Sequence, residues 1–143
     1  MAGMSGNAAS EIVELCPLIQ VFDMLESVRF YCTQLGFGIA AQSPMIETPY
    51  AHFNWALLQR GAVQLMLNTA YEGAERPPSR DAPRVAAHAD TILYFACPDV
   101  DGAYRRLKAA GLALDPPAVA PYGMKQISFS DPDGYAICLQ WRV

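Results

Sequence analysis

Apolar and polar positions follow the same order in both halves of the chain. In the first half, an apolar run over 15–21 is followed by apolar residues at helical spacing over 24–36. In the second half, an apolar run over 91–97 is followed by helical spacing over 100–111. The pattern predicts that each half begins with a strand that leads directly into a helix.

The residues at both ends of the two predicted helices are typical of helix caps. Asp23 precedes the first helix as a candidate N-cap, Glu26 completes a capping-box pattern, and Asp99 holds the matching position in the second half. Gly36 and Gly111 supply the left-handed residue that commonly ends a helix. The two aspartates are 76 positions apart and the two glycines 75, and this near-constant separation indicates an internal duplication.

Three further strand-like runs follow each predicted helix. The last two runs of each half are joined by short turns that contain Gly61 and Gly134. The predicted strands are 37–42, 52–59 and 62–68 in the first half, and 112–114, 125–129 and 135–141 in the second half. Each half is therefore predicted to have the order βαβββ.

We predict an α+β fold of two tandem βαβββ units that form a partly open barrel. The N-terminal residues 1–10 are expected to be disordered, and residues 11–143 to form a single domain. Within it, unit one spans 11–68, a linker rich in Ala, Pro and Arg spans 69–90, and unit two spans 91–143. One such unit leaves one sheet face without a helix, so two units or two chains are needed to enclose a cavity.

Composition narrows the classes of partner. The 143 residues are 52% hydrophobic and 17% charged, with a net charge of −4, and no dense basic cluster offers a surface for nucleic acid or anionic lipid. Neither a membrane span nor a signal peptide is recognisable, so we expect a cytoplasmic protein. The four cysteines are scattered singly, which favours reduced thiols over a disulfide framework.

In this order and at these spacings, several short motifs together resemble the vicinal oxygen chelate superfamily. This superfamily includes glyoxalase I, extradiol dioxygenases, fosfomycin-resistance thiol transferases and bleomycin-resistance proteins. The resemblance covers about residues 15–141 and is carried by Val21-Phe22-Asp23, Leu35-Gly36-Phe37, the segment 60–67, Asp99-Val100-Asp101, the segment 107–111, and Phe129 to Gly134 with its Asp-Pro-Asp-Gly turn.

The resemblance implies four metal-ligand positions, usually occupied by His, Gln and Glu. Counted from the capping aspartates and the turn glycines, these positions fall on Cys16, Met66 (or Leu65), Ile92 and Cys138. An isoleucine cannot ligate a metal, so we expect no family-type metal and no cofactor. A soft Cu(I)-like site of Cys16, Met66 and Cys138 is the less favoured alternative.

A metal-free cavity would be lined by small, apolar and amide side chains. Alternation along the strands places Cys16, Gln20, Met66, Cys138 and Gln140 on the concave side. The loop 121–124 resembles a tract of the bleomycin-resistance branch, whose members bind drug at a dimer interface without metal. The full set of expected ligand-binding residues is Cys16, Gln20, His52, Trp55, Met66, Tyr94, Tyr122, Met124, Cys138 and Gln140.

We therefore expect metal-independent binding of a small, uncharged or cationic organic molecule by a homodimer, of the type that gives antibiotic resistance by sequestering a drug. A superfamily enzyme (a lyase, isomerase or thiol transferase) with a non-standard active site that uses His52, Glu47 or Tyr122 is the first alternative. A structural or interaction module is the second alternative.

Overall fold

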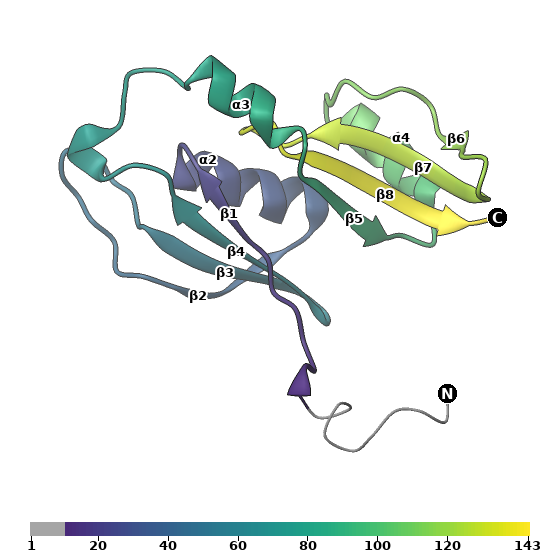
Figure 1. Cartoon of the computed structure of the whole chain (residues 1–143), viewed down its shortest axis with the longest axis horizontal. Coiled ribbons are helices and arrows are strands. Elements are labelled where there is room, and N and C mark those ends of the chain that lie inside the picture. The colour runs from purple at the N-terminus through teal and green to yellow at the C-terminus, as the bar shows by residue number, and fades with distance from the viewer. Residues whose placement is uncertain (1–10) are drawn as a thin grey trace.

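The computed structural model describes residues 11–143 and contains two four-stranded sheets of the same topology (Figure 1). The first sheet has the order β1-β4-β3-β2, with β1 at Leu18–Val21, β2 at Gly38–Gln42, β3 at Trp55–Arg60 and β4 at Val63–Thr69. The second has the order β5-β8-β7-β6, with β5 at Ile92–Ala96, β6 at Ala118–Val119, β7 at Met124–Ser130 and β8 at Ala136–Arg142. The expected duplication and the α+β class are confirmed, and the two sheets remain separate rather than closing into a barrel.

Each sheet combines one parallel pair with antiparallel pairs. β1 runs parallel to β4, and β5 runs parallel to β8, whereas the remaining neighbours are antiparallel. A parallel partner requires a crossover rather than a tight turn. The helix that follows β1 and the helix that follows β5 begin these two crossovers.

The first crossover helix is α2 (Met24–Arg29), which continues as the π-helical segment η1 (Phe30–Gln34). Asp23 is its N-cap as predicted, since its carboxylate accepts a hydrogen bond from the Glu26 amide at 3.2 Å. The capping box is only half formed, because the Glu26 carboxylate lies 3.1 Å from the Arg80 guanidinium instead. The second crossover helix is α4 (Val100–Ala109), which Asp99 caps through the Gly102 amide at 2.9 Å.

Two predicted strands differ from the structure. Residues 112–114 do not form a strand, because the Leu112 amide donates to the Leu107 carbonyl at the end of α4 and the Leu114 carbonyl accepts from Lys108. The second strand of this unit is instead the two-residue β6, beyond Pro116 and Pro117. In the first unit, β3 begins at Trp55 rather than at residue 52.

The chain between β4 and β5 contains a short 3₁₀ turn, η2 (Gly73–Glu75), and the helix α3 (Ala82–His88). In Figure 1 this segment passes from the first sheet over to the second. The predicted disorder at 1–10 lies outside the described residues. None of the helices within 11–143 has the length and apolar character needed to cross a bilayer.

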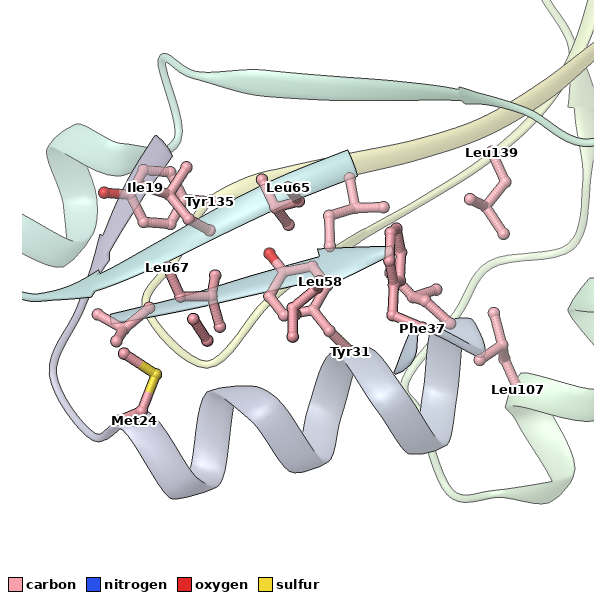
Figure 2. Packing of buried hydrophobic residues seen from close by; sticks show 14 of the residues in the cluster. Ile19, Met24, Tyr31, Phe37, Leu58, Leu65, Leu67, Leu107, Tyr135 and Leu139 are labelled. Carbon is pink, nitrogen blue, oxygen red and sulfur yellow. The ribbon is translucent and has the colours of Figure 1, made fainter. Parts of the chain in front are cut away.

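The hydrophobic core is shared between the two units. Alternate residues of β1, β3 and β4 face α2, and the most deeply buried side chains include Tyr31, Leu58 and Leu67 (Figure 2). From the second unit, Leu107, Ile137 and Leu139 belong to the same cluster. The helix-facing sides of both sheets therefore pack into this core, apart from a cavity where the two units meet, and their other sides are not part of it.

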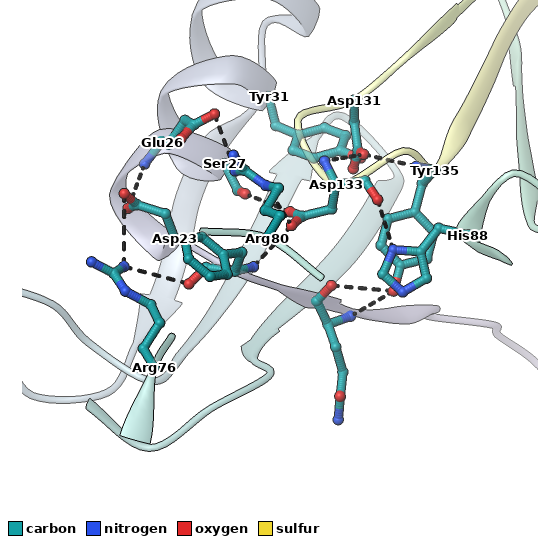
Figure 3. A network of polar contacts seen from close by, with 12 residues as sticks. Asp23, Glu26, Ser27, Tyr31, Arg76, Arg80, His88, Asp131, Asp133 and Tyr135 are labelled. Carbon is teal, nitrogen blue, oxygen red and sulfur yellow. Dashed lines mark hydrogen bonds and ion pairs between the residues drawn. The ribbon is translucent and has the colours of Figure 1, made fainter. Parts of the chain in front are cut away.

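A buried polar network ties α2 to the turn between β7 and β8 (Figure 3). The Tyr31 hydroxyl donates to the Asp131 carboxylate at 2.6 Å. The Asp133 carboxylate accepts from the Phe22 amide at 3.0 Å and from the Ser27 hydroxyl at 3.2 Å, and the Arg80 Nε lies 3.3 Å from it. Tyr31 and Ser27 are 100 and 106 positions from their partners in the sequence, so the Asp-Pro-Asp-Gly turn fixes how the two units sit together.

Candidate functional site

The face of the first sheet that does not meet α2 carries apolar and amide side chains. On it Leu18 is paired with Met66, and Met66 with Leu57. One step along, Gln20 is paired with Asn68, which is paired with Trp55. Leu18 is 45% exposed although it lies on the β1 strand, so the part of this face around Leu18 is left uncovered by the rest of residues 11–143.

The second sheet has an equivalent open face. Here Tyr94 is paired with Cys138, and Cys138 with Ser128. Ile92 and Tyr94 are 47% and 55% exposed, whereas Leu93 and Phe95, which alternate with them along the strand, pack against the core. We use "open faces" for these two surfaces, formed by Leu18, Gln20, Trp55, Leu57, Met66 and Asn68 in the first sheet and by Ile92, Tyr94, Met124, Gln126, Ser128, Cys138 and Gln140 in the second.

A hydrogen-bonded amide cluster crosses the second open face. The Gln126 side-chain amide donates to the Gln140 oxygen at 2.8 Å and to the Tyr122 hydroxyl at 2.7 Å. These bonds hold the two glutamines in fixed orientations, and Tyr122, in the turn just before β7, remains 67% exposed. The cluster can offer an amide donor or acceptor to a ligand, with an aromatic ring beside it.

Eight of the ten predicted residues lie on the open faces or border them. Trp55 and Met66 belong to the first face, Tyr94, Met124, Cys138 and Gln140 to the second, and Tyr122 joins the second through Gln126. Gln20 belongs to the first face, where its side-chain oxygen accepts from Arg84 of α3 at 2.7 Å.

The other two predicted residues lie elsewhere. Cys16 precedes β1 in a segment without regular structure, although the Pro17 carbonyl still accepts from the Met66 amide. His52 is buried in the loop before β3, where its Nδ1 lies 2.8 Å from the Tyr50 carbonyl and its ring packs against Gly73. The ring is therefore held by the loop and does not belong to either sheet face.

Six members of the open faces are absent from the set of predicted ligand-binding residues: Leu18, Leu57, Asn68, Ile92, Gln126 and Ser128. Gln126 and Ser128 lie on β7, and Leu57 lies on β3. The alternation of β7 carries the signal, because Gln126 and Ser128 alternate with the core residues Ile127 and Phe129.

The positions that correspond to metal ligands do not form a donor set. Met66 lies opposite Leu18 in the first sheet, and Cys138 lies opposite Tyr94 in the second. Ile92, the fourth position, offers no donor atom at all. Within residues 11–143, no three His, Cys, Asp or Glu side chains gather closely enough to hold a metal ion. The residues present therefore do not fit a family-type metal centre.

The Cys138 thiol is reduced and buried. Burial raises its pKa, and a hydrogen bond with Ser128 offsets part of that rise. At neutral pH it is therefore a thiol rather than a thiolate, which is the form that neither attacks an electrophile nor ligates a metal well. Its place in the centre of the second open face is that of a small apolar side chain.

Comparison with known proteins agrees with this architecture. Residues 12–139 match the sequence model of the Glyoxalase/Bleomycin resistance protein/Dioxygenase superfamily. Among proteins of curated function, none matches the sequence.

Solved structures share the fold at low identity. A bleomycin resistance determinant encoded on the transposon Tn5 is 21% identical, with a TM-score of 0.66 over 92% of this chain and 98% of that chain. A bleomycin-binding protein complexed with bleomycin is 21% identical, with a TM-score of 0.65 over 92% of this chain and 100% of that chain. TnmS3, an antibiotic binding protein from Streptomyces sp. CB03234, is 24% identical, with a TM-score of 0.65 over 93% and 98% of the two chains. With the family match over most of its length, this chain belongs to the glyoxalase/bleomycin resistance protein/dioxygenase superfamily.

Proposed function

We propose that the protein binds a small, uncharged or cationic organic molecule on the open sheet faces, without a metal, in a cavity that a second copy of the chain encloses. The observation that carries this proposal is the second open face, where Tyr94 is 55% exposed beside the Gln126–Gln140 amide pair. Cavities that bind small organic molecules combine such an apolar, aromatic lining with a few fixed polar groups.

The charge of the open faces supports this choice of ligand. All the side chains that define the two open faces are neutral. Arg142 lies only at the edge of the second face, where it is paired with Met124. An anionic ligand would find no cluster of cations there, whereas an uncharged molecule would lose little solvation on entering.

The exposed apolar area supports a homodimer. Leu18, Ile92 and Tyr94 lie on regular strands and are each between 45% and 55% exposed. An extended apolar face of this kind marks a ligand or protein contact in soluble proteins. Since the helix-facing sides already pack into the shared core, a second chain is the partner that can cover both open faces at once.

The relatives support the drug-binding interpretation. One solved structure of the same fold is a bleomycin-binding protein complexed with bleomycin, and another is an antibiotic binding protein. Metal independence is supported by Ile92 and by the protonated thiol of Cys138 at positions where metal-binding relatives need ligands. Together these features favour sequestration of a drug-like molecule, and with it antibiotic resistance.

The enzyme alternative has no comparable support. Tyr122 joins the second open face, whereas His52 lies in the loop before β3 and Glu47 is an exposed residue of the same loop. A general acid and base must both reach one reacting group, and these three residues do not converge on one surface.

Calorimetric titration of EDTA-treated protein with two cationic probes, bleomycin and doxorubicin, tests the binding proposal. We expect at least one probe to bind, and Tyr94→Ala to weaken its binding by about tenfold, since an aromatic contact in a desolvated site is worth about 1–2 kcal/mol. Val119→Ala is the matched control, because Val119 is 56% exposed but pairs with Lys125 on the opposite face of the same sheet.

Two results would contradict the binding proposal. One is that the probes bind only after a metal is added, and the other is that Tyr94→Ala and Val119→Ala lose equal amounts of probe affinity. The dimer is tested separately by sedimentation equilibrium of the free protein. A monomer at micromolar concentration would show that a second copy does not enclose the site.

A further inference from the structure

A separate cavity of about 630 Å³ lies on the helix-facing side, at the seam between the two units. It is bordered by Leu35, Phe37 and Arg60 from the first unit and by Phe95, Arg106 and Leu139 from the second. Figure 2 shows Phe37 and Leu139 from the two units at this end of the core. Its volume is within the range of about 300–1,000 Å³ that is typical of small-molecule sites. The open faces do not form this cavity, because Phe95 and Leu139 alternate with Tyr94, Cys138 and Gln140 along their strands.

The inner wall of the cavity is apolar and aromatic. Leu35, Phe37 and Leu139 are between 5% and 6% exposed, and the Phe37 and Phe95 rings meet edge to face with centroids 6.1 Å apart. A ring or short alkyl group placed against this wall would gain the hydrophobic transfer free energy of its buried surface. The wall therefore fits the apolar body of a ligand.

Two guanidinium groups border the same cavity. Arg60 donates to the Leu35 carbonyl at 2.7 Å, and Arg106 donates to the Gln34 carbonyl at 2.7 Å. Each group has five N–H donors, so these bonds orient the side chain and leave other donors available. Within residues 11–143, neither guanidinium lies within 4.0 Å of a carboxylate oxygen.

The single acidic group in the lining does not neutralise both cations. Asp99 caps α4 and accepts from the Gly102 amide at 2.9 Å, so its carboxylate is already bonded to the start of that helix. The lining thus has two cations and one committed anion. A carboxylate would be a better partner for the remaining guanidinium donors than any neutral group, because Arg and carboxylate form charge-assisted hydrogen bonds.

We propose that this seam cavity is a second ligand site, for a small organic acid with an aryl or alkyl body. The body packs against Phe37 and Phe95, and the carboxylate accepts hydrogen bonds from Arg106 and Arg60. A ligand here touches both units at once, so its binding stabilises their mutual arrangement and raises the stability of the folded chain. The open faces would still bind their own, uncharged or cationic ligand.

The test compares two probes that differ only in charge, naphthalene-1-acetate and naphthalene-1-acetamide, by calorimetry and by amide chemical shifts. We expect the acid to bind about tenfold more tightly than the amide, and to shift amides of residues 35–37 and 95–99. Arg106→Gln should weaken binding of the acid by about fivefold to tenfold and leave the affinity for the amide unchanged. Arg105→Gln, which removes the same charge from the neighbouring position without bordering the cavity, should leave both affinities unchanged.

A second variant keeps the test independent of Arg106. Val63 borders the cavity and is 45% exposed, so Val63→Glu adds a carboxylate there at little cost to folding and should abolish binding of the acid. The proposal is overturned if the acid and the amide bind equally, if neither binds at millimolar concentration, or if Arg105→Gln and Arg106→Gln weaken the acid alike. Binding at the open faces is scored separately, because bleomycin affinity should not change in Arg106→Gln.

Discussion

The bond between Tyr31 and Asp131 gives a quantitative test of how the two units are held together. The Tyr31 ring is fully buried, and its hydroxyl donates to a carboxylate that is 5% exposed, at 2.6 Å (Figure 3). Tyr31→Phe keeps the ring and removes only this donor. Asp131 would keep its bonds from the Asp133 and Tyr135 amides, both at 2.9 Å, on its other oxygen.

The expected loss follows from the charge of the acceptor. A hydrogen bond to an ionised group contributes about 1.5–3 kcal/mol, and a neutral hydrogen bond about 0.5–1.5 kcal/mol. We therefore expect Tyr31→Phe to lower the free energy of unfolding by about 1.5–3 kcal/mol at pH 7.5.

The loss should depend on pH. Burial raises the pKa of Asp131 in the folded protein, and the hydrogen bond from Tyr31 lowers it again in part. Because the folded-state pKa lies above that of the unfolded chain, the stability that Asp131 contributes is present at acid pH and is lost as pH rises through the folded-state pKa. Removing Tyr31 raises this pKa further, so the variant loses more stability on the alkaline side of that window than on the acid side.

Urea unfolding of wild type and Tyr31→Phe between pH 4 and pH 8 measures this difference. The loss of unfolding free energy in Tyr31→Phe should fall toward about 1 kcal/mol at the acid end, where Asp131 is protonated and its hydrogen bond with Tyr31 is a neutral one. Tyr104→Phe is the control, since the Tyr104 hydroxyl has no hydrogen-bond partner in the described part of the chain. A penalty below about 0.5 kcal/mol, or one that grows toward acid pH, would refute the reasoning.

Three further outcomes are expected. Asp133→Ala should lower the free energy of unfolding, measured in urea, by about 2–4 kcal/mol, because the Phe22 amide, the Ser27 hydroxyl and Arg80 lose a shared acceptor. The control Asp115→Ala removes an exposed carboxylate and should change this free energy by less than about 0.5 kcal/mol. Equal effects of the two substitutions would contradict the network. Gly134→Ala should lower the free energy of unfolding more than Gly61→Ala in the same assay. Both glycines have positive φ, but only at Gly134 would the added Cβ lie 2.5 Å from a backbone oxygen, that of Val85. A smaller loss of stability at Gly134 would refute this geometry. The Cys138 thiol is 3% exposed and has a raised pKa, so it should react with iodoacetamide more slowly than the half-buried Cys16. Intact-mass and peptide mass spectrometry follow the two modifications. Faster modification of Cys138 would show that the open face exposes its thiol.

The duplicated topology could be predicted from the sequence because local signals repeat in both halves. Asp23 and Asp99 cap the two crossover helices, and Gly36 and Gly111 have positive φ after them. Where prediction failed, one long-range contact and the local hydrogen bonds of one helix end decided the structure. Glu26 pairs with Arg80 rather than completing the capping box, and residues 112–114 finish a helix end instead of forming a strand.

The candidate site was predicted less evenly. Alternation along β8 was enough to place Cys138 and Gln140 on one face, because strand periodicity is local. His52 could not be placed in this way, because the start of β3 depends on pairing with β2 and β4. The seam cavity was not predicted at all, since Arg60 and Arg106 come together only when the two units pack. Their wide separation in sequence gives no local signal.

The central claim is that the open faces bind a small organic molecule without a metal, and a chemical-shift map tests it most directly. Bleomycin and, in a second titration, doxorubicin are added to isotope-labelled, EDTA-treated protein. The account predicts that amide shifts cluster on the strands of the open faces, around Tyr94, Gln126, Cys138 and Gln140 in the second sheet and Met66 in the first. Shifts that appear only after a divalent metal is added, shifts confined to the seam cavity, or no shifts with either probe would contradict it.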